Sequence, residues 1–172
     1  EDDRFLMKAG EVMPVTAHIE KNETEFKIKL FDTLDPKNSS KKIAKDFTAP
    51  INYLTRRAKL IPKITAIIKT NQYIDGIGLH RMNPFDPNKI PVILIHGFKS
   101  NPSTWVNLIN QLQSDPKIRN RFQFWTFSYP TGIPILYSTM RLRNELNSMR
   151  EFYDPKGSNK NLNNMVLVGH SM

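Results

Sequence analysis

The chain has 172 residues, which is enough for one globular domain and short for two. With 39% apolar and 24% charged residues it has the composition of an ordinary globular protein. The lack of cysteine excludes disulfides, thiolate metal sites and a cysteine nucleophile, and no apolar run is long enough to suggest a membrane-spanning helix. The sequence begins without Met or a signal-peptide pattern, so we expect the natural N-terminus to lie further upstream.

The net charge of +9 is concentrated in residues 37–69, which hold nine basic residues and one acid. One interpretation is a helix on an anionic membrane, which would use the cluster Arg56, Arg57, Lys59 and Lys63. The other, which we favour, is a solvated helix whose apolar stripe packs on the rest of the protein. Because no nucleic-acid motif accompanies the segment, we expect no nucleic-acid partner.

Residues 1–83 are predicted to form a small accessory segment. Residues 12–19 and 25–34 are predicted to form two strands, and in the second of them apolar and polar residues alternate. The two could pair as a hairpin, although the turn chemistry of residues 20–24 is weak. A basic loop follows, and a helix is expected to begin near Thr48. The turn-rich stretch 83–88 indicates a domain boundary between residues 83 and 84.

From residue 84 to residue 172, strand and helix patterns alternate. Residues 90–95 and 165–168 are apolar on both faces, as in strands buried within a parallel sheet. Between them we predict an aromatic strand at 122–129 and two amphipathic helices, with the two tryptophans as core anchors. The first helix is expected to start at Asn101-Pro102, and the second to end at Asp154-Pro155. The order strand, helix, strand, helix, strand predicts an α/β fold, with a βαβαβ unit in a parallel sheet.

The first motif with chemical meaning is Gly169-His170-Ser171, which directly follows the strand predicted at 165–168. A strand-to-helix turn at this point would hold the Ser171 hydroxyl over the end of the sheet, as a nucleophile requires. Because such a turn is strained, Gly169 is expected to supply clearance and His170 to pack beside the turn. The alternative is a serine in an ordinary turn with no chemistry.

The second motif, His96-Gly97-Phe98, directly follows the strand predicted at 90–95. Acyl transfer by a serine creates an oxyanion that needs preorganised N–H donors. Gly97 allows the backbone to bend closely, so that the N–H of Phe98 can point into the site, and Met172 would supply a second N–H. We interpret His96 as a residue that shapes this loop and not as the general base.

Together the two motifs resemble the α/β-hydrolase superfamily, and within it bacterial esterase and lipase-like proteins of the lipase and inositol-deacylase-like branch. The stretches that carry the finer resemblance are 47–50, 85–91, 123–125 and 129–132. The resemblance implies that Ser171 is the nucleophile, and that Phe98 and Met172 are the oxyanion donors. It also implies cleavage of carboxylic or lipid esters without a metal or organic cofactor, and a secreted or bacterial envelope location.

In this fold the nucleophile precedes the acid and the histidine along the chain. All four histidines precede Ser171, so the base and its carboxylate are expected beyond Met172. We therefore expect the chain to be the N-terminal part of a longer hydrolase and to be inactive alone. The alternative function is a non-catalytic binding or membrane-docking module that uses the basic segment.

Overall fold

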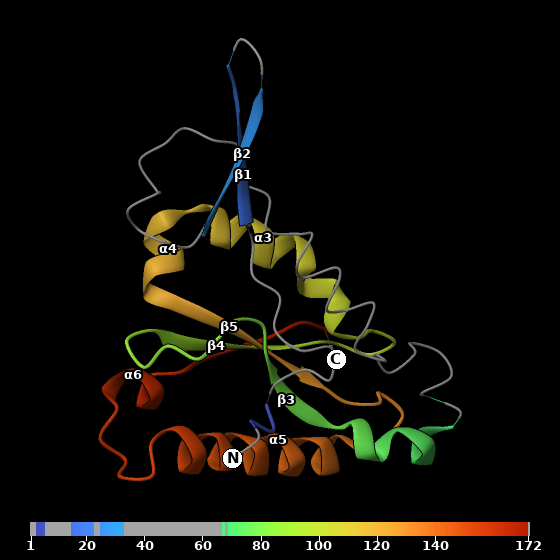
Figure 1. The fold of residues 1–172 in the computed structure, drawn as a ribbon. Coiled ribbons are helices and arrows are strands. Elements are labelled where there is room, and N and C mark those ends of the chain that lie inside the picture. Colours follow the sequence, from blue (N-terminus) through green and yellow to red (C-terminus); the bar gives the residue numbers. More distant parts are fainter. Residues whose placement is uncertain (1–2, 6–14, 23–24, 33–66, 68, 172) are drawn as a thin grey trace.

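The computed structural model describes residues 3–5, 15–22, 25–32, 67 and 69–171, and it has mixed α and β content (Figure 1). The elements, in chain order, are β1 (Val15–Lys21), β2 (Phe26–Asp32), the 3-10 helix η2 (Thr70–Gly76), β3 (Gly78–Arg81), β4 (Ile90–Ile95), the 3-10 helix η3 (Pro102–Trp105), α3 (Val106–Ser114), α4 (Pro116–Arg121), β5 (Phe122–Ser128), α5 (Ile135–Tyr153), α6 (Lys160–Asn163) and β6 (Val166–Gly169). In the described part of the chain, no helix has both the length and the apolar character needed to cross a membrane.

The larger sheet has four strands in the order β3-β5-β4-β6. Strand β4 pairs in parallel with both β5 and β6, whereas β3 pairs antiparallel with β5. The sheet is therefore mixed, and its parallel part has the connectivity predicted from the alternating patterns. Because β4 lies between β5 and β6, the ends of β4 and β6 are neighbours.

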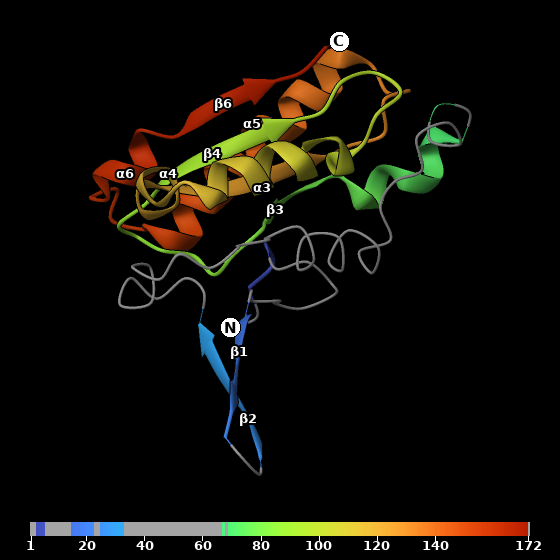
Figure 2. The same cartoon turned by 90° about the horizontal axis from the view of Figure 1, so that it is seen from above.

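Helices cover the two faces of this sheet, with α3 and α4 on one side and α5 on the other (Figure 1, Figure 2). Alternation along β4 sends Ile93 to the core under α5 and Leu94 to the core under α3. Strand β5 does the same with Trp125 and Phe124, so its aromatic residues fill both cores. Trp105 is also buried, and both tryptophans are core residues as expected.

The predicted helix start at Asn101 is confirmed, because its side chain accepts a hydrogen bond from the N–H of Ser103 at 3.1 Å. The end predicted for the long helix is also confirmed, with Asp154 as the cap of α5. No strand was predicted between the second hairpin strand and residue 90, yet β3 lies there. This four-residue strand is too short to show periodicity, and it exists because it pairs with β5.

Two expectations about the ends of the larger domain need correction or qualification. The strand expected at 165–168 to be buried is an edge strand in the described residues, where Leu167 is 52% exposed. The expected boundary at residues 83 and 84 does not divide the sheet, because β3 lies before it and pairs with β5. The helix expected from Thr48 lies outside the described residues.

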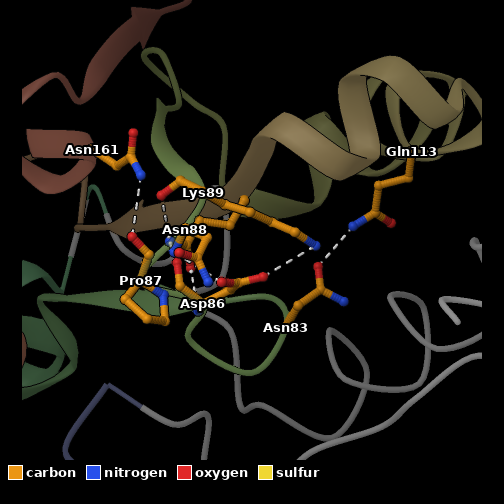
Figure 3. Close-up of polar contacts among 8 residues, drawn as sticks. Asn83, Asp86, Pro87, Asn88, Lys89, Gln113 and Asn161 are labelled. Carbon is orange, nitrogen blue, oxygen red and sulfur yellow. Dashed lines mark hydrogen bonds and ion pairs between the residues drawn. The ribbon is translucent and has the colours of Figure 1, made fainter. Parts of the chain in front are cut away.

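The turn that precedes β4 is held by side chains from β5, from α6 and from the turn itself (Figure 3). Gln123 donates from Nε2 to the carbonyls of Asp86 and Lys89, at 2.8 and 3.0 Å. Asn161 donates to the carbonyl of Pro87 at 3.2 Å. Asp86 accepts from the N–H of Asn88 at 2.9 Å. Residues 85–91, one of the stretches that carry the finer resemblance, therefore have a structural role at the amino end of β4, away from Ser171.

An N-terminal strap, residues 3–5, completes the core under α5. Phe5 is fully buried against Trp125, and its carbonyl accepts from the N–H of Arg81 at 3.1 Å. Asp3 accepts from Arg81 Nε at 2.8 Å and from the Tyr153 hydroxyl at 2.6 Å. Nothing in the sequence pattern predicted this strap, because one apolar residue among charged ones has no period.

Asp3→Ala is expected to lower the free energy of unfolding by about 2–3 kcal/mol, because the buried Arg81 loses its carboxylate partner. Burial alone raises the pKa of Asp3, but hydrogen bonds from Tyr153, Phe5 and Arg81 bring it below its ordinary 3.8. The stabilisation by ionised Asp3 is therefore fully present above about pH 4, where Asp3 is ionised even in the unfolded chain, and it is lost as the pH falls through the lowered pKa of the folded state. Urea unfolding should show the two proteins converging below pH 4, whereas Asp75→Ala, at an exposed position, should match the parent throughout.

Candidate functional site

The candidate site lies at the carboxyl ends of β4 and β6, where the two predicted motifs meet. The N–H of His170 donates to the carbonyl of Ile95 at 3.0 Å, which extends the pairing of the two strands to the turn. Ser171 then adopts a φ of 35°, in the left-handed region. A non-glycine residue rarely adopts this conformation, so the turn after β6 is strained at the serine.

Gly97 is the glycine that this arrangement requires. A Cβ at this position would overlap the backbone carbonyl groups of His170 and Ser171. The loop after β4 therefore reaches the serine turn through direct backbone contact, which a side chain would prevent. The position of Gly97 after a buried strand predicted a close bend of the backbone, but not which backbone groups it would meet.

The N–H of Phe98 lies at the serine turn, as predicted, but it is occupied there. It donates to the carbonyl oxygen of Ser171 at 3.0 Å. In this geometry the N–H is not free to receive an oxyanion. Met172, the second expected donor, lies outside the described residues.

The expectation that Gly169 supplies clearance for the turn is not supported by the described residues. A Cβ at Gly169 would have no neighbour within 4 Å, and the residue lies on the exposed strand β6. The strain at the turn is carried by Ser171 itself, and the crowded position is Gly97. His170 is exposed, and its ring meets Trp105 edge-on with centroids 5.9 Å apart.

His96 lies inside the protein, which is consistent with its interpretation as a loop-shaping residue. Its side chain is fully buried and stacks on Tyr129, with ring centroids 4.4 Å apart. The Tyr129 hydroxyl donates to the His96 carbonyl at 2.6 Å. Burial lowers the pKa of His96 to about 4, against a smaller opposing effect of its hydrogen bond to Gly97. The ring is therefore neutral and shielded at physiological pH.

Tyr129 is a residue of this site that the sequence analysis missed. It is buried, and burial raises the pKa of its phenol. Its ring and hydroxyl together hold the backbone of the loop that begins at His96. Its place at the end of an aromatic strand was visible in the sequence, but the pattern gave no reason to separate it from the core aromatics.

Among the described residues, no side chain forms a hydrogen bond with the Ser171 hydroxyl. Nor does any group of three or more His, Asp or Glu side chains in that part of the chain come together as metal ligands. The basic cluster named above, Arg56, Arg57, Lys59 and Lys63, lies outside the described residues.

Comparison of the chain with protein-family models, with curated proteins and with solved structures finds no match. The comparisons therefore identify no family. The structure shows an α/β protein in which a strained, exposed serine and a glycine loop meet at the ends of adjacent parallel strands.

Gly97→Ala is expected to push the serine turn away from β4, because the new methyl group would occupy the space of two carbonyl groups. The expected loss of stability is about 2 kcal/mol, and the amide of His170 should exchange its hydrogen faster once its bond to Ile95 weakens. Gly169→Ala is the matched control, with a change within about 1 kcal/mol. Equal effects of the two substitutions would contradict the assignment of Gly97.

His96 is expected to remain neutral well below the pH at which a solvated histidine ionises. Its pKa of about 4 in the folded state lies below the ordinary 6.5. The unfolded chain therefore takes up the proton first, and stability declines as pH falls from 6.5 to 4, by about 3 kcal/mol in all. Proton NMR of the ring should show no titration between pH 8 and pH 5 in the folded protein. A midpoint near 6.5, as expected in urea, would refute the buried geometry.

Proposed function

We propose that this chain is part of a serine hydrolase of the α/β-hydrolase type that cleaves carboxylic esters. Ser171 Oγ would attack the acyl carbonyl carbon while a general base takes its proton. The leaving alcohol would depart with that proton, and water would then hydrolyse the acyl-enzyme, releasing the acid and restoring Ser171. Neither step needs a metal or an organic cofactor.

The observation that supports this proposal most directly is the strained conformation of Ser171 beside Gly97. A serine with a φ of 35° after a parallel strand, exposed to solvent, fits a nucleophile held on a strand-to-helix turn. An ordinary turn serine has no need of this strain, nor of a neighbouring loop that tolerates only glycine.

The role of Phe98 in the proposal requires a rearrangement of one hydrogen bond. Its N–H must exchange the Ser171 carbonyl for the oxyanion of the reacting ester. In a strand-to-helix turn the serine carbonyl accepts a bond from the helix that follows, which would release the N–H. Met172 would then supply the second donor.

The general base must come from elsewhere. His96 is buried, neutral and stacked on Tyr129, so it cannot take the proton of Ser171. His170 lies against Trp105. The proposal therefore assigns the base and its carboxylate to a segment after residue 172, placed beside the open edge of β6. The alternative of a membrane-docking module rests on a basic segment outside the described residues.

The exposed apolar side chain of Phe98, beside the serine turn, favours an ester with an apolar acyl group. Phe98 is 54% exposed on the loop after β4. The N–H of Lys99 donates to the hydroxyl of Thr131 at 3.2 Å, which joins this loop to the segment between β5 and α5. At the start of α5, Leu136 is 82% exposed, while Tyr137 packs on the core. The start of α5 thus offers apolar surface as well as core contacts.

A fluorophosphonate probe is expected to label Ser171 in the protein that contains this chain together with the sequence following it, because an activated serine attacks the probe irreversibly. Ser171→Ala should abolish labelling and lower ester hydrolysis by at least about 10³-fold. Ser158→Ala, at an exposed serine of a surface turn, is the control and should leave both unchanged. Labelling that persists in Ser171→Ala would reject the assignment.

A further inference from the structure

The hairpin of β1 and β2 carries an exposed apolar face that the proposed hydrolase chemistry does not use. Residues paired directly across the two strands share a face, and the register pairs Ile19 with Ile28. The residues of this apolar face are Val15, Ala17, Ile19, Phe26, Ile28 and Leu30. Every one of them is exposed, Phe26 by 72% and Leu30 by 69%.

The opposite face of the hairpin carries His18, Glu20, Lys27 and Lys29, together with Phe31 towards one end, and Glu20 contacts two of these residues. Lys29 donates to Glu20 at 2.9 Å, and His18 lies 3.6 Å from the same carboxylate. The hairpin is therefore amphipathic, with a polar face suited to water. Both cartoon views show it standing apart from the larger sheet (Figure 1, Figure 2). A two-stranded hairpin is only marginally stable by itself, so its apolar face needs a partner.

We propose that this apolar face is the interface of a homodimer, in which two hairpins pack face to face around a two-fold axis. The charged residues in the register of this face lie at its two ends: Lys21 at the hairpin tip, 5.7 Å from the centroid of the Phe26 ring, and Asp32 at the other end, paired with Val15. Two copies would therefore meet without bringing unpaired charges together at the centre. The pair would form two packed layers of sheet, with the charged faces outward.

The area of the face is sufficient for such a dimer. At the exposures found, the apolar residues present on the order of 500 Å² per copy, or about 1,000 Å² for the pair, which reaches the lower bound of specific interfaces. An anionic membrane is the less suitable partner. On the polar face Glu20 pairs with Lys29, and in the register of the apolar face the one cation, Lys21, is matched by one acid, Asp32.

The test compares adjacent positions of β1 that point to opposite faces. Light scattering of the 172-residue chain is expected to give a dimer at tens of micromolar, and Ile19→Glu should shift the dissociation constant upward by at least about 100-fold. His18→Glu introduces the same charge on the polar face and should leave the dimer intact. Circular dichroism checks that both variants fold.

A cross-linking measurement keeps the proposal testable if the glutamate variant fails to fold. Because the chain has no cysteine, Ile19→Cys introduces a single thiol near the centre of the face. Mild oxidation should yield a covalent dimer from Ile19→Cys and little from His18→Cys. A monomer at all concentrations, or equal cross-linking of the two variants, would overturn the proposal. Monomeric protein that binds phosphatidylcholine vesicles through Ile19 would also overturn it, and would assign the face to lipid.

Discussion

The close approach of Gly97 to the carbonyls of His170 and Ser171 determines the arrangement of the carboxyl edge of the sheet. It can occur because β4 and β6 are adjacent and parallel, so that the segments after both strands leave on the same side. Tyr129 fixes the other side of the same loop through the carbonyl of His96. The serine turn is thus positioned by backbone contacts, which are less variable than contacts between long side chains.

The residues around the serine turn divide into a buried pair, His96 and Tyr129, and an exposed pair, Ser171 and Phe98. His96 and Tyr129 support the loop from inside the protein. Burial lowers the pKa of His96 and raises the pKa of Tyr129, so both rings are neutral near pH 7. Ser171 and Phe98 are exposed to solvent. The buried pair therefore holds the loop, and the exposed pair is accessible from outside, as the proposed function requires.

The elements that were predictable from the sequence are those with a long apolar run or a recognisable start signal. Ile93 and Leu94 belong to an apolar run that indicated a buried strand, and Asn101 supplied a recognisable helix start. Strand β3 and the strap at Phe5 were not predictable, because short segments acquire their structure from partners distant in sequence. At the site, chemistry suggested Gly97 correctly, whereas the expected crowding at Gly169 depended on neighbours that a linear pattern does not reveal.

The N-terminal strap has a consequence for the order in which the protein folds. Asp3 and Tyr153 are separated by 150 positions, and Arg4 and Glu145 by 141. During synthesis the strap leaves the ribosome before β3, β5 and α5, so the surface on which it packs does not exist until those elements have assembled. Closing so long a loop is slow relative to local contacts, so the strap is expected to reach its final position after those local contacts have formed. Until then, the aromatic side chains around Trp125 that Phe5 covers in the folded protein remain exposed to water and to other chains.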